Sequence, residues 1–204
     1  HPPTPPNLSY PPTPPTSLSN RIILVNTRGI DPSINSACHW KLDYFKENYT
    51  QEDDIFIPII AMNEHWLKPH ITDAQINIPQ YQIVRADRKQ RLRGGSLLYI
   101  HDDLPLSDAV TYDEYYCQAV MCTIKPSNTI IINVYRPPDT PEESTSSLLK
   151  LLDNYIKKPT VDHHMDIILT GDINLPCINW QDLTIKRDGD ASSTQLYLQY
   201  KEDK

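Results

Sequence analysis

Glycine is scarce in this chain, with 5 residues among 204. The first strongly apolar run, at 21–25, is not followed by a glycine-rich loop of the kind that cradles a phosphate group. The Rossmann dinucleotide site and the P-loop nucleotide site both depend on such a loop. The sequence therefore gives little support to these two classes of nucleotide-binding protein.

Cysteines and long apolar runs are few as well. Cys38, Cys117, Cys122 and Cys177 show no CxxC spacing and are too sparse for a disulfide scaffold, so we expect reduced thiols. No run approaches the roughly 18 apolar residues of a membrane span, and the first residues do not form a signal peptide. We expect a soluble chain with no membrane partner. Because the chain begins with His1 rather than Met, its natural start and its localisation stay open.

Positive charge is in deficit, since 19 Lys and Arg face 26 Asp and Glu for a net charge of −7. Nucleic-acid binding normally requires a basic patch, so the overall balance argues against such a partner. One segment, RADRKQRLR, is an exception and holds Arg85, Arg88, Lys89, Arg91 and Arg93. It either supplies a local patch for phosphate contacts or forms a solvated hairpin without a partner.

Proline is abundant and unevenly placed. Eight of the 19 prolines lie in residues 1–20, HPPTPPNLSYPPTPPTSLSN, which carry no charged side chain. This composition predicts a disordered, extended tail, followed by a folded domain over 21–204. PPTPP would suit an SH3 or WW domain, but a passive linker is the preferred interpretation.

The remaining chain alternates apolar strands with amphipathic helices. Runs rich in β-branched or apolar residues predict strands at 21–25, 55–62, 96–100, 118–124, 129–134 and 166–170. Apolar side chains at three-to-four spacing predict helices at 36–49, with Ser36 as the N-cap, and at 142–157. This order indicates an α/β domain, either a doubly wound sheet or a two-sheet sandwich with outer helices.

Polar side chains follow the four strongest strands, namely Asn26, Glu64, Tyr135 with Arg136, and Asp172 with Asn174. Ligand groups in α/β proteins gather beyond the carboxyl ends of strands, where loops converge. Oxygen ligands such as Asn26, Glu64 and Asp172 suit Mg²⁺, so hydrolysis of a phosphodiester is the natural hypothesis. Turn stabilisation is the alternative for Asn26, Asp172 and Asn174, but it explains Glu64 and the Tyr–Arg pair less well.

Five motifs occur along the chain: VNTRGI at 25–30, AMNEHWL at 61–67, YQIVRADRKQRLRGGSLLYI at 81–100, NVYRPPDTP at 133–141 and LTGDINLPCINW at 169–180. In this order they resemble the endonuclease/exonuclease/phosphatase family, in the form carried by non-LTR retrotransposons. The combination of YRPP with GD-x-N-x-P is specific, although either one alone is weak. The resemblance covers about residues 21–180. It implies a DNase I-like four-layer α/β/β/α sandwich that cuts DNA with Mg²⁺ or Mn²⁺.

The same resemblance implies roles for the residues at the strand ends. Glu64 would hold the metal ion with help from Asn26. Tyr135 would contact the scissile phosphate, while Asp172 would orient or deprotonate the attacking water. Asn174 would help to position the phosphate and Asp172.

DNA contacts are also implied by the resemblance. They are expected from Arg85, Arg88, Arg93 and Arg136. Arg136 would act either on its own loop or on a nearby phosphate. Trp66 is expected to pack beneath the site rather than to stack on a base.

Two departures from the family bear on the expected activity. The family closes with a Ser-Asp-His motif whose His contacts the phosphate, and nothing after Trp180 matches it. The segment 192–204 instead predicts a helix, so we expect a chain truncated at its C-terminus, with an unpaired sheet edge. Weak or absent nicking follows, because an acid–base contribution of about 10²–10⁴-fold is lost. Asn63 stands where the family more often has a hydroxyl residue, which leaves the support of Glu64 open.

Three functions compete. The first is a retrotransposon endonuclease with access to the nucleus, whose parent protein carries a reverse transcriptase that extends the nicked 3′ end. The second is a phosphatase or phosphodiesterase of the same fold, acting on lipid or inositol phosphates. The third is a non-catalytic fragment or interaction module that displays the Pro-rich tail. YRPP and the R-x-DR segment favour the first, whereas oligomeric state and DNA target preference are not fixed by the sequence.

Overall fold

The computed structural model describes residues 22–31, 36–49, 57–89, 91, 93–114, 116–125, 127–138, 140–156, 166–175, 178–179 and 184–185. The tail predicted at 1–20 and the helix predicted at 192–204 lie outside these ranges. Within them, no helix combines the length and the hydropathy needed to cross a membrane.

The first sheet has four strands in the order β1-β2-β4-β3. They are β1 (Ile22–Asn26), β2 (Ile59–Asn63), β4 (Ser96–His101) and β3 (Tyr81–Ala86). β1 and β2 are parallel, whereas β4 runs antiparallel to both β2 and β3. The carboxyl ends of β1, β2 and β3 therefore lie along one edge of this sheet.

The second sheet also has four strands, in the order β5-β6-β7-β8. They are β5 (Leu106–Glu114), β6 (Cys117–Ile124), β7 (Thr129–Tyr135) and β8 (Ile167–Asp172). β6 is antiparallel to both of its neighbours, and β7 is parallel to β8. A small antiparallel pair, β9 (Ile178–Asn179) and β10 (Thr184–Ile185), follows.

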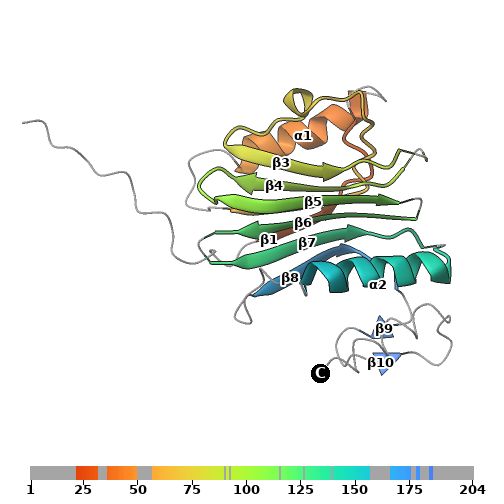
Figure 1. The fold of residues 1–204 in the computed structure, drawn as a ribbon. Coiled ribbons are helices and arrows are strands. Elements are labelled where there is room, and N and C mark those ends of the chain that lie inside the picture. Colours follow the sequence, from red (N-terminus) through yellow and green to blue (C-terminus); the bar gives the residue numbers. More distant parts are fainter. Residues whose placement is uncertain are drawn as a thin grey trace, which may run out of the picture.

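The two sheets stack, and one helix covers the outer face of each (Figure 1). Because strand side chains alternate between faces, each central strand contributes to two apolar layers. Met62 of β2 belongs to one cluster with Phe45 of α1 (Ser36–Tyr49), and Ile132 of β7 belongs to another with Leu148 of α2 (Glu142–Ile156). Ile131 instead faces the other sheet. The layers run α/β/β/α, so the predicted two-sheet sandwich is confirmed and the doubly wound alternative is excluded.

Both predicted helices and all six predicted strands are present; α1 has the predicted bounds, and the other elements have shifted ends. The largest shift is at β2, which begins at Ile59 rather than at residue 55. The sequence did not predict β3, β5 or the short 3₁₀ helix η1 (Asp73–Gln75). β5 is a polar edge strand whose register shifts between Ser107 and Val110, so it lacks the clean apolar alternation that marks a strand.

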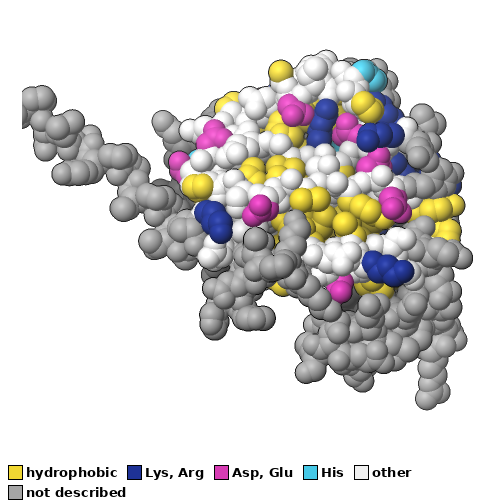
Figure 2. Space-filling view, in the orientation of Figure 1, with side chains coloured by type: hydrophobic (Ala, Val, Ile, Leu, Met, Phe, Trp, Pro, Cys, Tyr) yellow, Lys and Arg dark blue, Asp and Glu magenta, His cyan; other side chains and the backbone are white. Residues whose placement is uncertain are grey.

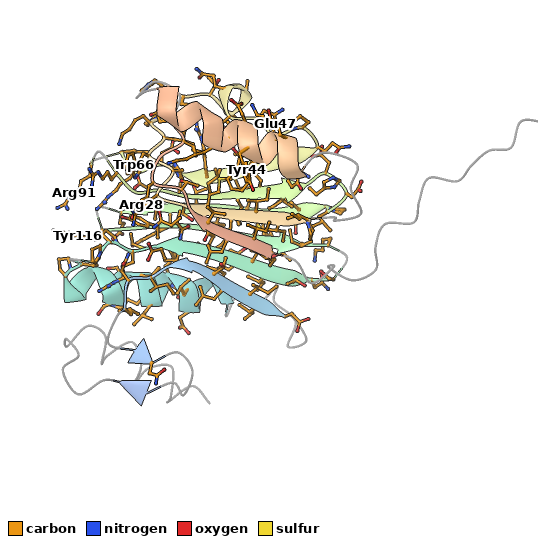
Figure 3. The ribbon with its side chains drawn as sticks, turned by 180° about the vertical axis from the view of Figure 1, so that it is seen from behind. Arg28, Tyr44, Glu47, Trp66, Arg91 and Tyr116 are labelled. Carbon is orange, nitrogen blue, oxygen red and sulfur yellow. The ribbon has the colours of Figure 1, made fainter. Side chains whose placement is uncertain are left out.

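Large apolar side chains are exposed on two edge strands, β1 and β8. Leu24 is 49% exposed, Ile167 43% and Leu169 50%. Both strands lie toward the viewer in Figure 3. These positions contrast with β2, β6 and β7, whose residues are buried along their whole length.

Candidate active site

Four polar side chains meet where β1, β2, β7 and β8 end. Asn26 Nδ2 donates a hydrogen bond to Asp172 Oδ2 at 2.9 Å, and the Tyr135 hydroxyl donates one to Glu64 Oε1 at 3.4 Å. Tyr135 and Asp172 are register partners on the parallel strands β7 and β8. Asn26 is the register partner of Asn63, the residue before Glu64. The two hydrogen-bonded pairs therefore lie side by side and join both sheets.

The turn after β2 is held by backbone hydrogen bonds on two sides. Glu64 N donates to Gly95 O at 3.0 Å, and Trp66 N donates to Gly94 O at 3.0 Å. On the other side, Glu64 O accepts from Gly29 N at 2.7 Å. Glu64 and Trp66 have φ values of 55° and 60°, in the left-handed region that non-glycine residues rarely adopt. The main chain thus sets the direction of the Glu64 carboxylate.

A buried polar cluster joins the two sheets directly beneath the site. Asn63, Ser96 and Asn133 are all fully buried. Asn63 Nδ2 donates to Val134 O at 2.8 Å, Asn133 Nδ2 donates to Met62 O at 3.2 Å, and Ser96 Oγ donates to Asn133 O at 2.8 Å. The amide at position 63 therefore ties β2 to β7.

Arg136 is buried and holds the loop after β8. Only 1% of the residue is exposed. Its Nη1 donates to Asn174 O at 3.1 Å, while Asn174 Nδ2 donates back to Arg136 O at 2.7 Å. Arg136 N also donates to Asp172 O at 2.9 Å. The guanidinium is enclosed by carbonyl groups and fixes the loop that carries Asp172 and Asn174, which is the first of its two expected roles, and it leaves little surface for a DNA contact.

Of the other three arginines expected to contact DNA, only Arg93 is exposed. Arg88 is 5% exposed and donates to Arg93 O at 3.3 Å, so it offers little surface for the predicted DNA contact. Arg85 Nε lies 3.0 Å from Asp73 Oδ1 and 3.7 Å from Asp87 Oδ1. These two carboxylates already neutralise the Arg85 charge, so its guanidinium has little capacity left to bind a phosphate.

Arginines and aromatic rings pair at the edge of the site. The Arg93 guanidinium carbon lies 5.2 Å from the centre of the Trp66 ring, and that of Arg91 lies 5.3 Å from the centre of the Tyr116 ring. Figure 3 shows four side chains together at this end of the molecule: Arg28, Trp66, Arg91 and Tyr116. A Cβ added to Gly29 would lie 2.6 Å from Trp66 Cε3, so Trp66 packs between the Gly29 main chain and Arg93. In Figure 2 the Lys and Arg side chains are interleaved with Asp and Glu rather than forming an unbroken basic face.

The Tyr135 hydroxyl stays protonated at physiological pH. Burial, together with the negative charge of Glu64, raises the pKa of Tyr135 to about 12. The hydroxyl is therefore a hydrogen-bond donor beside the Glu64 carboxylate. At this position it can donate equally to a phosphate oxygen.

The oxygen donors of the site fit a hard divalent cation. The Asn26 amide nitrogen is engaged by Asp172, so a metal ion would bind the amide oxygen, Oδ1, which accepts one hydrogen bond from Arg28 N at 3.3 Å and has a second lone pair. The described ranges contain no cluster of three or more His, Cys, Asp or Glu. A site built on the Glu64 carboxylate and the Asn26 amide suits Mg²⁺, which keeps several waters and takes substrate phosphate oxygens as ligands.

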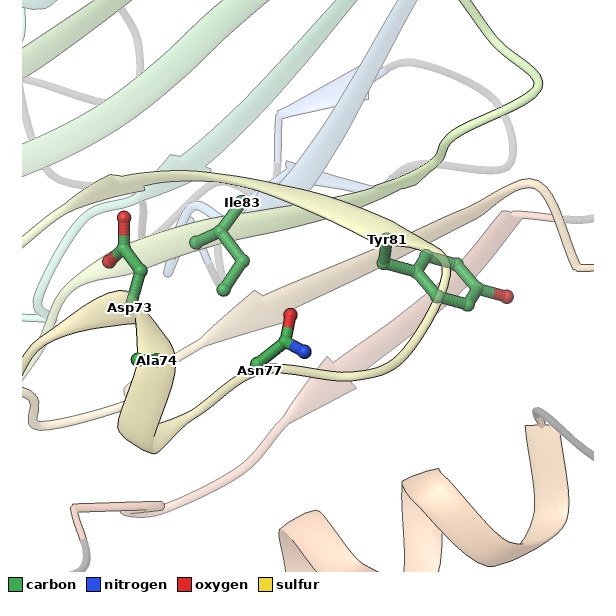
Figure 4. A pocket seen from close by; sticks show the side chains of 5 residues that line it. All are labelled: Asp73, Ala74, Asn77, Tyr81 and Ile83. Carbon is green, nitrogen blue, oxygen red and sulfur yellow. The ribbon is translucent and has the colours of Figure 1, made fainter.

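A separate open pocket lies beside η1 and β3 (Figure 4). It is lined by Asp73, Ala74, Asn77, Tyr81 and Ile83. None of these is among the predicted site residues, so this pocket is distinct from the strand-end site.

Some supporting residues were missed from the sequence. Asn133 gave a usable signal, because a polar residue within the apolar run TIIINV marks a buried hydrogen bond. Lys41 gave none, although its Nζ donates to Thr27 O at 2.6 Å and to Arg28 O at 3.2 Å and so holds the loop after β1. Its partners are main-chain carbonyls, which any sequence supplies.

No protein-family model matches the chain, and no curated protein matches it. Solved structures do. An AP endonuclease from Archaeoglobus fulgidus is 20% identical with a TM-score of 0.58, over 89% of this chain and 69% of that protein. The 3′ phosphatase NExo from Neisseria, bound to a product DNA hairpin, is 14% identical with a TM-score of 0.60, over 89% and 70%. The endonuclease domain of TRAS1, a telomere-specific non-LTR retrotransposon, is 16% identical with a TM-score of 0.52, over 89% and 70%.

These likenesses concern the fold. The chain spans 69% to 70% of the length of these three proteins and 65% of an AP endonuclease from Leishmania major, so part of each has no counterpart here. The chain has the α/β/β/α sandwich fold of the endonuclease/exonuclease/phosphatase proteins, as its motifs indicate.

Proposed function

We propose that the chain is a metal-dependent DNA-nicking endonuclease domain of a retrotransposon-derived protein. The observation that carries the proposal is the meeting of Asn26, Asp172, Tyr135 and Glu64 at adjoining strand ends. The likeness to the TRAS1 endonuclease domain and the DNA hairpin bound by the Neisseria phosphatase support DNA as the substrate. A reverse transcriptase domain in the parent protein and access to the nucleus belong to the same proposal.

The side chains divide the reaction among them. Glu64 and Asn26 would hold Mg²⁺ or Mn²⁺, which would supply positive charge against the negative charge that develops on the phosphate. Asp172 accepts a proton from the attacking water, whose oxygen bonds to phosphorus. The bond from phosphorus to the 3′ oxygen breaks, and that oxygen leaves as a hydroxyl with a proton from solvent. Tyr135 donates a hydrogen bond to the phosphate.

We expect slow cleavage from this set of residues. Glu64 and Asp172 are the carboxylates that the site brings together, and the described ranges hold no larger cluster of His, Cys, Asp or Glu. No third His, Cys, Asp or Glu of the described ranges joins these two carboxylates to protonate the leaving oxygen. A missing general acid lowers the rate by about 10²–10⁴-fold.

Metal-dependent nicking of supercoiled plasmid tests the proposal. The purified chain is expected to produce open circles with Mg²⁺ or Mn²⁺ and none with EDTA, because the phosphate charge is then uncompensated. Inositol polyphosphates and phosphoinositide vesicles, added as competitors and as substrates, test the second function. If inorganic phosphate is released from these compounds and the plasmid is not nicked, inositol or lipid phosphates replace DNA as the substrate. If no substrate is hydrolysed, the chain is a non-catalytic module.

Arg93 is the arginine best placed to contact the DNA backbone. Its guanidinium is exposed yet fixed on the Trp66 ring, so a phosphate contact costs little side-chain ordering. We expect Arg93→Ala to weaken DNA binding about fivefold at low salt and to reduce the slope of log affinity against log salt by about 1. Fluorescence anisotropy with a labelled duplex measures both quantities.

Lys125→Ala is the matched control for Arg93, because Lys125 lies in the β6–β7 turn at the opposite end of the sheet. It removes the same charge and should leave the slope unchanged. Equal slopes for Arg93→Ala and the wild-type chain would remove Arg93 from the DNA surface.

A further inference from the structure

His65 follows Glu64 directly and is fully buried. Its Nδ1 accepts a hydrogen bond from Leu67 N at 3.0 Å, so the imidazole closes a two-residue turn around Trp66. Burial lowers the pKa of His65 to about 3, so the ring is neutral. Nδ1 therefore carries a free lone pair with which it accepts from Leu67 N.

The imidazole also fills the space between this turn and the strand beside it. A Cβ added to Gly95 would lie 2.3 Å from His65 Cε1 and Nε2, so the ring rests on the Gly95 main chain. Gly95 O is the acceptor for Glu64 N. On the far side, His65 Nε2 lies 4.0 Å from the buried carboxylate of Asp87. The ring therefore packs against the peptide group that holds Glu64.

The main chain on both sides of His65 is in an unfavourable conformation. Glu64 and Trp66 both have positive φ values, which cost free energy unless surrounding contacts impose them. His65 O accepts from Ile30 N at 2.9 Å, which anchors the same turn to the loop after β1. The His65 side chain adds two contacts inside the turn, from Nδ1 to Leu67 N and from the ring to the Gly95 main chain.

We propose that His65 is a positioning residue that keeps Glu64 in its left-handed conformation and its carboxylate at the metal position. The cation that Glu64 would bind is Mg²⁺ or Mn²⁺, so this role of His65 rests on the proposed function. His65 acts through one hydrogen bond: Nδ1 accepts from Leu67 N, and this bond holds the turn that directs the Glu64 carboxylate. His65 itself touches neither metal nor substrate.

Two variants of the 204-residue chain separate the acceptor from the volume of the ring. In His65→Asn the amide oxygen can still accept from Leu67 N in an Asx-type turn. In His65→Leu the apolar volume is kept and the acceptor is lost. Amide hydrogen exchange by NMR at Glu64, Trp66 and Leu67 gives a readout that needs no metal. Calorimetric titration with Mn²⁺ gives the second readout, and thermal unfolding checks the fold.

We expect His65→Leu to speed exchange at the three amides about tenfold and to weaken Mn²⁺ binding by about 10-fold or more, with His65→Asn close to wild type. Unchanged exchange and Mn²⁺ affinity in a folded His65→Leu protein would overturn the role. If His65→Leu does not fold, His65→Asn decides, since faster exchange at Glu64 despite the retained acceptor contradicts the mechanism. A wild-type chain that binds no Mn²⁺ removes the proposed metal function, and the exchange rates still decide whether His65 positions Glu64.

Discussion

Replacing Asp172 with asparagine is expected to slow plasmid nicking by about 10²–10⁴-fold while the fold stays intact. The amide oxygen of Asn can still accept the hydrogen bond that Asn26 Nδ2 donates at 2.9 Å. The variant therefore keeps the shape and the contact at the end of β8. It loses the negative charge and the ability to take a proton from water. Initial rates of open-circle formation at saturating Mn²⁺ measure the effect.

Asp166→Asn provides the matched control for Asp172. Asp166 is exposed and immediately precedes β8, at the opposite end of the strand from Asp172. The same chemical change there should leave the nicking rate within about twofold. Circular dichroism spectra and thermal midpoints of both variants should match those of the wild-type chain. If Asp172→Asn nicks as fast as Asp166→Asn, Asp172 does not activate the water, and the site must be assigned elsewhere.

The sequence predicts the strands that carry this site because buried strands depend on local patterns. Apolar β-branched runs predict buried strands, and strands of one direction bring their ends to one edge of a sheet. Asn26, Glu64 and Asp172 could be grouped on this reasoning before any contact was known. Asn26 and Asp172 then prove to be hydrogen bonded, and Glu64 is bonded to Tyr135.

The burial of the arginines could not be predicted from local patterns. Charge predicts exposure, yet Arg136 is 1% exposed and Arg88 is 5% exposed. Each donates to main-chain carbonyl groups that reach it only in the folded chain. Because main-chain partners carry no sequence signature, the pattern of basic residues overestimates the exposed basic surface. β5 was missed for a related reason, since a polar edge strand takes its pairing from β6 rather than from its own pattern.

Four of the seven non-glycine residues with positive φ in the described ranges lie at the end of the molecule that carries the site. Arg28, Glu64, Trp66 and Asn174 all have φ values between 46° and 60°. A residue in this region costs on the order of 1–3 kcal/mol when it is not glycine, so the surrounding bonds must offset that cost. The mutual hydrogen bonds of Arg136 and Asn174 do so after β8, and the Gly94 and Gly95 carbonyls do so after β2. Polar side chains held in this way are oriented before a ligand arrives.

Gly171 is the position where a single methyl group should cost most. It has a φ of 132° and lies immediately before Asp172 in the GD-x-N-x-P motif. A Cβ added here would lie 2.0 Å from Val134 O and 2.7 Å from Val134 N. These are main-chain atoms of β7 that pair with β8, so they cannot move aside as a flexible side chain could. Only glycine combines this φ with this close approach of two strands.

We therefore expect Gly171→Ala to lower the free energy of unfolding by about 3 kcal/mol or more and the thermal midpoint by roughly 6–12 °C. Thr170→Ala, one residue earlier on the same half-buried strand, should cost about 1 kcal/mol or less. Urea unfolding followed by circular dichroism compares the two. Because the displaced strand carries Asp172, any folded Gly171→Ala protein should also nick more slowly than Thr170→Ala. Equal stability of the two variants would mean that β7 and β8 are not packed as closely as the 2.0 Å approach requires.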